Sequence, residues 1–250
     1  MSNLKRATYV WYDTFVKTVV SGLIVLKKFS GRLQMPEKSP YWKPRLSDYY
    51  EKEVPVMTFG VSSACFYPKP TEQAVELLGK AGIHQIEIFY NSFSELEQPF
   101  TYRLKELLRR YDMEVKSVHP FSSAFEPYMF FTDYERRFQD ILEFYKQYYD
   151  CMNQLGAEIL VFHGDRKDSF FPEEQYFERF FRLTEQAASY GITVAQENVA
   201  RCRSHSTLFL KRMCQALPNA SFVLDIKQAV RSRQDPFELV ELFGKRLALY

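Results

Sequence analysis

From Met57 onward, short apolar stretches with strand character alternate strictly with longer helical patterns. Near-continuous apolar strands are buried on both faces of a sheet, and strands separated by helices pair in parallel. Strands are expected over residues 58–61, 85–89, 115–119, 159–163, 193–197 and 222–225, with the start of a seventh at 247–250. Helices are expected over residues 72–80, 100–111, 132–155, 172–190, 206–216 and 236–243. The alternation predicts an α/β fold built on a parallel sheet.

The ends of the expected strands distinguish between the common parallel folds. No G-x-G-x-x-G follows the first strand and no G-x-x-x-x-G-K-[ST] occurs in the chain, which disfavours a nucleotide-binding doubly wound sheet. Most strands end in polar residues, and in a barrel every such end faces one site. We therefore expect a (β/α)8 TIM-barrel type of fold that is incomplete, with six β/α units and the start of strand seven.

Residues 1–56 lack this alternation and are expected to form an N-terminal extension, partly helical or disordered, ahead of an incomplete barrel over residues 57–250. A helix over residues 9–29 is predicted within the extension. Its longest uncharged run, Thr18–Leu26, is shorter than the roughly 20 residues that cross a bilayer. The segment also lacks a signal-peptide cleavage pattern. We expect no association with a membrane.

Charge and cysteine content narrow the class of protein further. The 33 Lys and Arg residues nearly balance the 31 Asp and Glu residues, for a net charge of +2. This balance gives no general argument for binding nucleic acid or an anionic membrane. The four cysteines are scattered and form no C-x-x-C pair, which is typical of reduced thiols in a cytosolic protein. A cytoplasmic location is predicted.

Carboxylates end the fifth and sixth expected strands, at Glu197 and Asp225. Because these strands are neighbours, the two side chains are expected to lie close together, where a shared proton or a divalent cation relieves their repulsion. Alternatively, each carboxylate pairs with a nearby base, such as Arg201 for Glu197 and Lys227 for Asp225. Both interpretations remain open on these residues alone.

Other polar candidates end the remaining strands. His119 and His163 end strands three and four, where a neutral imidazole ligates a metal or bonds to a substrate hydroxyl. Glu87 alternates with isoleucines in strand two and points to the opposite face, either in a structural ion pair or as a substrate contact. Lys227 and Arg201 are the candidate substrate-binding cations, and Lys227 is expected to hold a phosphate or carboxylate.

Six motifs, each at a strand end and in chain order, carry a resemblance to a known family: GVSSACFYP, QIEIFYNSFSE, SVHPFSSAFEP, VFHGDRK, AQENVARCRS and VLDIKQAVRS. At these residues the chain resembles the sugar phosphate isomerase/epimerase family, the xylose isomerase-like barrels that also include endonuclease IV. The resemblance runs from about Met57 to Tyr250. Its motifs are specific for the family but not for one substrate.

The resemblance implies an eight-stranded barrel with a divalent metal (Mn²⁺, Mg²⁺, Co²⁺ or Zn²⁺) at the carboxyl ends of the strands. By position, Glu197 and Asp225 match metal ligands of the epimerase-like members, and Glu197 is the expected proton-transfer group. His119 and His163 match histidines that bind metal in the nuclease branch and contact substrate in the sugar branch, so by this resemblance we expect them to bind substrate here. We therefore expect a metal-dependent isomerase or epimerase acting on a sugar or sugar phosphate.

Two departures from the family pattern qualify this expectation. Gln228 stands where the family often has a histidine, which argues against a nuclease-type site. The strand-seven and strand-eight ligands have no counterpart before Tyr250, so impaired activity is expected. The alternatives are a metal-dependent phosphodiesterase or abasic-site endonuclease, and a non-enzymatic or partner-completed barrel fragment. The last alternative includes a homo-oligomer.

Overall fold

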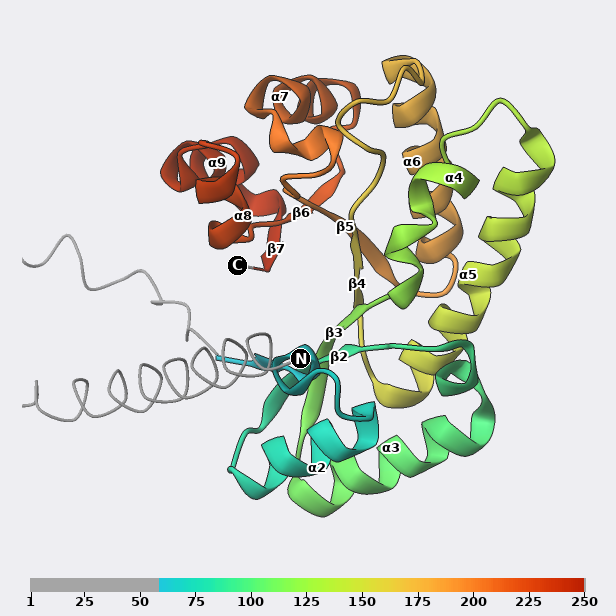
Figure 1. Cartoon of the computed structure of the whole chain (residues 1–250), viewed down its shortest axis with the longest axis vertical. Helices are drawn as coiled ribbons and strands as arrows, with labels where there is room; N and C mark the ends of the chain where they lie inside the picture. Colours follow the sequence, from blue (N-terminus) through green and yellow to red (C-terminus); the bar gives the residue numbers. More distant parts are fainter. Residues whose placement is uncertain (1–58, 250) are drawn as a thin grey trace, which may run out of the picture. The chain divides into compact units, whose positions relative to one another are not determined.

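The computed structural model describes residues 59–249. Within them, seven parallel strands form one sheet in the order β1-β2-β3-β4-β5-β6-β7, so each strand pairs with its neighbours in sequence. The sheet curls into a half-barrel with the helices along its outer side (Figure 1). The strands are β1 (Val61–Ser62), β2 (Gln85–Phe89), β3 (Glu114–His119), β4 (Ile159–Phe162), β5 (Thr193–Glu197), β6 (Ser221–Val223) and β7 (Leu247–Leu249). The predicted α/β fold of TIM-barrel type is confirmed.

Helices follow the strands in alternation and form an arc around the sheet (Figure 1). The longer helices are α2 (Thr71–Lys80), α3 (Gln98–Tyr111), α5 (Glu135–Leu155), α6 (Glu173–Ala188), α7 (Thr207–Ala216) and α9 (Pro236–Phe243). The shorter elements are α4 (Glu126–Met129), α8 (Ile226–Arg231) and the 3₁₀ turns η2 (Ser63–Phe66), η3 (Phe93–Leu96), η4 (Phe121–Ala124), η5 (Arg203–His205) and η6 (Gly244–Arg246). Across residues 59–249, no helix is long and apolar enough to cross a bilayer.

Most element boundaries follow the sequence pattern. Strands 85–89 and 193–197 and helix 236–243 match β2, β5 and α9 residue for residue. Helix α5 begins at Glu135, later than predicted, and ends before Gly156, whose φ of +74° is the left-handed geometry that glycine tolerates. The N-terminal extension, with its predicted helix, lies outside the described residues.

The end of strand six differs from the prediction. Strand β6 stops at Val223, whereas the apolar run predicts a strand that continues to Asp225. The Asp225 side chain caps α8, because its Oδ1 accepts a hydrogen bond from the backbone N–H of Gln228 at 2.8 Å. An aspartate in this position satisfies a free N–H at the start of a helix. The sequence pattern alone does not indicate α8.

An aromatic layer packs the helices against the outer face of the sheet. Phe162, directly at the end of β4, lies edge-on to Phe130 with ring centroids 5.3 Å apart, and it also contacts Phe180 of α6. Phe222 of β6 stacks on Phe243 of α9 with centroids 4.3 Å apart. All five rings are buried. Because successive strand residues point to opposite faces, the neighbours of these residues point to the concave face.

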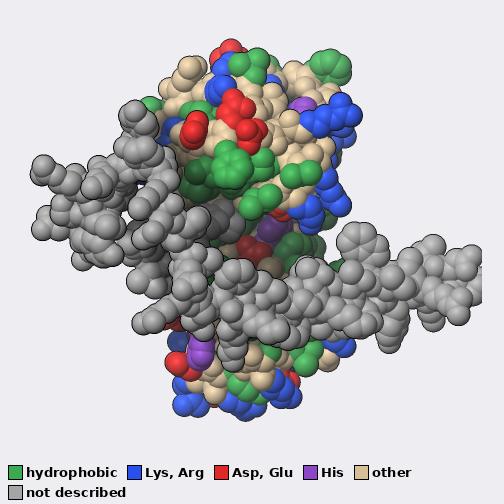
Figure 2. Space-filling model, turned by 90° about the vertical axis from the view of Figure 1, so that its left-hand side faces the viewer, with side chains coloured by type: hydrophobic (Ala, Val, Ile, Leu, Met, Phe, Trp, Pro, Cys, Tyr) green, Lys and Arg blue, Asp and Glu red, His purple; other side chains and the backbone are tan. Residues whose placement is uncertain are grey.

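The concave face carries the polar residues of the strands. Glu87 of β2, Ser117 and His119 of β3 and Glu197 of β5 alternate along their strands with buried apolar or outward-facing residues. Figure 2 looks onto this side and shows a hollow in which acidic and histidine side chains are visible. The carboxyl ends of parallel strands meet at one edge, so the fold gathers these groups there.

Candidate active site

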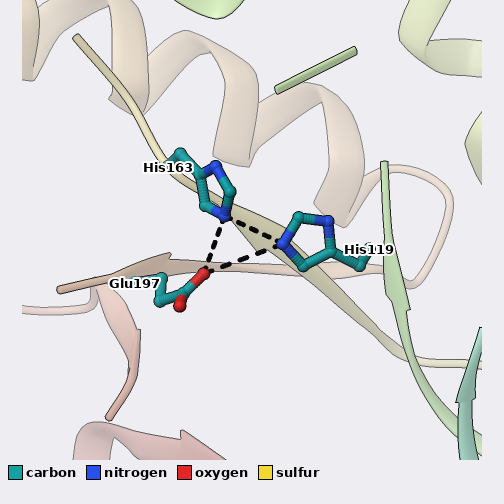
Figure 3. A group of neighbouring side chains, drawn as sticks. All are labelled: His119, His163 and Glu197. Atoms are coloured by element: carbon teal, nitrogen blue, oxygen red, sulfur yellow. Dashed lines mark hydrogen bonds and ion pairs between the residues drawn. The ribbon is translucent and has the colours of Figure 1, made fainter. Parts of the chain in front are cut away.

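Three side chains from consecutive strands converge at the carboxyl edge of the sheet (Figure 3). His119 ends β3, His163 directly follows β4 and Glu197 ends β5. The Nε2 atom of His163 lies 2.8 Å from Glu197 Oε2 and 2.8 Å from His119 Nε2, and His119 Nε2 lies 3.8 Å from Glu197 Oε2. Each of the three residues offers one possible metal-ligand atom, and these three atoms lie within 4.8 Å of one another. We call it the His–His–Glu cluster.

Hydrogen-bond partners outside the cluster determine where its protons lie. His119 Nδ1 is 3.3 Å from the Pro120 carbonyl, which only accepts, so Nδ1 carries hydrogen and Nε2 presents a lone pair. The Arg201 guanidinium only donates, and its Nη2 is 3.2 Å from His163 Nδ1, so a neutral His163 carries its hydrogen on Nε2. That hydrogen faces two acceptors, Glu197 Oε2 and His119 Nε2. A single hydrogen therefore links the three side chains.

Burial and hydrogen bonding set the charges in the cluster. Burial alone raises the pKa of Glu197, but its contacts with the His119 and His163 imidazoles outweigh burial and lower the pKa to about 2. Burial lowers the pKa of His163 from its ordinary value, against the opposing effect of the Glu197 carboxylate. Near neutral pH the cluster thus consists of an ionised carboxylate beside a neutral His163 imidazole.

The donor set of the cluster suits a divalent cation. Imidazole nitrogen and carboxylate oxygen are ligands that Zn²⁺, Mn²⁺ and Co²⁺ accept, and catalytic zinc sites use three protein ligands with one position open. His119 Nε2 and Glu197 Oε2 already carry lone pairs and lie 3.8 Å apart. His163 Nε2 presents one after its hydrogen leaves that atom. The residues therefore fit a metal of the kind that the sequence predicts.

A buried carboxylate that the sequence argument missed holds the His163 peptide. Glu126, at the start of α4, is fully buried, and its Oε2 accepts the backbone N–H groups of His163 at 3.0 Å and Gly164 at 2.6 Å. Its Oε1 accepts a hydrogen bond from the Tyr145 hydroxyl at 3.2 Å. Burial raises the pKa of Glu126 to about 8. Glu126 thereby ties the loop after β3 to the end of β4.

The buried side-chain amide of Gln196 binds the backbone carbonyls at the end of β4. Gln196 Nε2 donates to the carbonyls of His163 and Glu197, both at 2.9 Å, and to that of Phe162 at 3.1 Å. Its Oε1 accepts a hydrogen bond from the Tyr176 hydroxyl at 2.6 Å. Gln196 and Glu197 are adjacent in β5, so one faces the helices and the other faces the concave side. The Gln196 amide thus joins the backbones of His163 and Glu197, two residues of the cluster.

The sequence profile of a family described as xylose isomerase-like TIM barrel matches residues 75–249. The chain belongs to this family. No curated protein sequence matches the chain.

Several solved structures share the fold of this xylose isomerase-like barrel chain. A D-tagatose 3-epimerase-like protein has 24% identity and a TM-score of 0.63, covering 76% of this chain and 72% of the other. The D-allulose 3-epimerase from Methylomonas sp., in complex with D-allulose, has 19% identity and a TM-score of 0.59, with 76% and 69% covered. The IOLI protein with a bound zinc atom has 17% identity and a TM-score of 0.63, with 78% and 72% covered. These likenesses show the fold.

The structure brings together only part of the site predicted for this barrel. Asp225 is half-buried and is not part of the His–His–Glu cluster, because its Oδ1 caps α8 and its backbone pairs with the Asn198 side chain. Lys227 is exposed on α8 and forms no ion pair with Asp225 within residues 59–249. Arg201 contacts His163 rather than Glu197. The role of Asp225 as a metal ligand stays a prediction.

Glu87 was predicted to form an ion pair or to contact substrate, and in the structure its partner is a serine hydroxyl. Its Oε2 accepts a hydrogen bond from the Ser117 hydroxyl at 2.9 Å, and the residue is half-buried on the concave face. Within the described residues, Glu87 forms no ion pair. A neutral hydroxyl leaves the carboxylate free to accept further hydrogen bonds. Its role as a substrate contact stays a prediction.

Proposed function

We propose that this chain is a metal-dependent isomerase or epimerase acting on a sugar or sugar phosphate. The observation that carries the proposal is the His–His–Glu cluster, a buried carboxylate beside two imidazoles at the carboxyl edge of the sheet. Active sites of barrels of this type lie at that edge. Structures with the same fold are described as a D-tagatose 3-epimerase-like protein and as a D-allulose 3-epimerase with D-allulose. Both descriptions support a sugar as the substrate.

Glu197 and Asp225 are the metal ligands expected from the sequence, and Asp225 stays a proposal. His119 and His163, expected as substrate contacts, are proposed to hold the metal together with Glu197 because the three side chains form one cluster. When bound, a divalent ion supplies polarisation of the carbonyl and hydroxyl oxygens of the sugar. Two imidazole nitrogens and one carboxylate oxygen are compatible with Zn²⁺, Mn²⁺ and Co²⁺ as the bound metal. Mg²⁺ is the fourth metal that we propose.

Glu197 is proposed to take the proton from the carbon beside the sugar carbonyl. Its Oε2 faces the two imidazoles, whereas Oε1 points away from them (Figure 3) and accepts no hydrogen bond from residues 59–249. The pKa of about 2 keeps the group ionised, at the expense of basicity.

The remaining predicted residues are proposed as substrate contacts. Glu87 lies on the concave face with a carboxylate that can accept a sugar hydroxyl. Arg201 and Lys227 are exposed cations on loops and short helices at the carboxyl edge, which suits a phosphate or carboxylate of the substrate. These contacts orient the carbon that loses its proton toward Glu197.

Solvent hydrogen exchange tests the proposed function. The full chain, stripped of metal and then supplied with each of the four ions, is incubated in D₂O with a panel of ketoses and ketose phosphates. We expect deuterium at the carbon beside the carbonyl, detected by NMR, and its loss in Glu197→Gln. Glu174→Gln, an exposed substitution on α6, serves as the matched control and retains exchange. Exchange that is absent with every metal, or equal in wild type and Glu197→Gln, would contradict the proposal.

A second candidate is a metal-dependent phosphodiesterase or abasic-site endonuclease. The observation that favours it is the position of His119 and His163 in one cluster with Glu197, because the matching histidines bind metal in the nuclease branch that the chain resembles. Cleavage of a duplex carrying an abasic site, with and without chelator, distinguishes it from the first proposal. Cutting that depends on metal and on His119 would favour the nuclease.

Three further expectations stay predictions. Impaired activity is measured by the rate in the same exchange assay. A homo-oligomer or partner-completed barrel is measured by light scattering of the purified chain. The cytoplasmic location is measured by fractionation of the native source.

A further inference from the structure

The contact between Arg201 and His163 opposes metal binding at the cluster. Arg201 Nη2 lies 3.2 Å from His163 Nδ1, and this contact requires a lone pair on Nδ1. Metal ligation through Nε2 requires the lone pair on Nε2, so the hydrogen of a neutral ring must then lie on Nδ1. That arrangement sets an N–H of His163 against an N–H of Arg201. The contact and the ligation therefore exclude each other.

Arg201 lies in a cationic rim that offers it another partner. The loop after β5 pairs with the loop after β4, since Lys167 N–H donates to the Arg201 carbonyl at 3.0 Å and Arg166 pairs with Cys202 in an antiparallel bridge. Arg166, Lys167 and Arg201 are all exposed, and within residues 59–249 none of them forms an ion pair. Figure 2 shows Lys and Arg side chains beside the hollow in which a histidine is visible. Such a rim attracts an anion.

We propose that Arg201 couples the binding of an anionic group to metal binding at His119, His163 and Glu197. A phosphate or carboxylate at the rim takes up the guanidinium and releases His163 Nδ1. The hydrogen then moves from Nε2 to Nδ1 through water, so the ring stays neutral and Nε2 becomes free to ligate. The coupling is reciprocal, so bound metal also raises the affinity for the anion. The inference rests on the proposed metal site and identifies an anionic substrate as the one that completes it.

Cobalt binding with and without sulfate tests the coupling. The full chain is titrated with Co²⁺, followed by its visible absorption, in chloride and in sulfate at equal ionic strength. We expect sulfate to tighten Co²⁺ binding to wild type by about tenfold, the effect of one charged hydrogen bond. Arg201→Met should bind Co²⁺ about tenfold more tightly than wild type in chloride and should not respond to sulfate.

A matched substitution separates the contact from the charge. Lys167→Met removes one positive charge from the same rim without touching His163, and it should change Co²⁺ affinity in chloride by less than about threefold. Nitrogen chemical shifts of the His163 ring provide a readout that does not need metal. In the metal-free wild type the hydrogen should lie on Nε2, and Arg201→Met should shift it toward Nδ1.

The outcomes distinguish this inference from the proposed function. Equal effects of Arg201→Met and Lys167→Met, or a wild-type affinity that sulfate leaves unchanged, would overturn the coupling while the metal site stands. A failure of every variant to bind Co²⁺ would overturn both. Binding by wild type only with sulfate, together with binding by Arg201→Met in chloride, would support both.

Discussion

Replacing Glu126 with leucine removes the carboxylate that accepts hydrogen bonds beneath the candidate site and puts an apolar side chain of similar size in its place. The backbone N–H groups of His163 and Gly164 then lose their partner in a fully buried position. The Tyr145 hydroxyl accepts a hydrogen bond from Ser122 Oγ at 3.4 Å, and by rotating it donates to that oxygen once Glu126 is gone. The substitution therefore leaves two buried donors unsatisfied at the end of β4.

Each unsatisfied buried donor costs about 1–3 kcal/mol, so Glu126→Leu should lower the free energy of unfolding by about 2–6 kcal/mol. This is a large share of the roughly 5–15 kcal/mol that stabilises a typical domain. Glu126→Gln should cost about 1 kcal/mol or less, because its amide oxygen still accepts both N–H groups. Burial raises the pKa of Glu126 to about 8, so at pH 7 the side chain is largely the neutral acid that glutamine imitates.

Urea unfolding of the full chain, followed by circular dichroism, measures these differences. Glu95→Leu is the matched control, because Glu95 is also a buried carboxylate that accepts a backbone N–H, from Asn91 at 2.6 Å, and a hydroxyl, from Thr71 at 3.0 Å. Both leucine variants should lose stability, but only Glu126→Leu should weaken Co²⁺ binding. A cost below about 1 kcal/mol, or equal effects of both variants on Co²⁺ binding, would refute the reasoning.

Three other substitutions have expected outcomes. Gly164→Ala should lower the free energy of unfolding by about 2–4 kcal/mol, because Gly164 has a φ of +83° and a Cβ there runs into the Tyr176 hydroxyl; an unchanged melting temperature would speak against this. Gln196→Leu should cost about 2–5 kcal/mol in urea unfolding, because three backbone carbonyls lose a buried donor; a neutral result would show that water replaces the amide. The pKa of Glu197 falls from its ordinary value of 4.5 to about 2 on folding, so the ionised group contributes about 3 kcal/mol above pH 4.5 that is lost as the pH falls toward 2. Acid unfolding should show this loss in wild type and a flatter profile in Glu197→Gln; superimposable profiles would contradict it.

The sequence predicts the sheet because its strands are short apolar runs with clear ends. The run 85–89 alternates in a way that only a strand uses, and its boundaries match β2. The residues that end such runs, His119, His163 and Glu197, meet because parallel strands end at one edge. Three members of the candidate site were thus accessible from local pattern and topology.

The supporting residues depend on directions that a linear pattern does not contain. Gln196 and Glu197 are adjacent and both polar, and only the pairing of β5 decides which one faces the helices. Glu126 lies in an irregular stretch without helical or strand period. One signal was present there, since a single acid among the aromatics of FEPYMFF indicates a buried carboxylate with partners.

Asp225 illustrates two competing uses of one residue type. An aspartate after an apolar run is a strand-end candidate, and an aspartate before IKQAVR is also a helix cap. The structure uses its Oδ1 for the cap, and the carboxylate does not join the His–His–Glu cluster. Local capping chemistry, which the strand pattern does not contain, decides this geometry.

Titration of the full chain with Zn²⁺ by calorimetry tests the proposed site most directly. Wild type should bind one ion per chain, and His119→Ala and Glu197→Gln should each weaken that binding by at least about tenfold, because each removes one ligand from the cluster. The exposed variant Glu174→Gln should bind as wild type does. Zn²⁺ binding with the same affinity and stoichiometry in all four proteins would contradict a metal site at His119, His163 and Glu197.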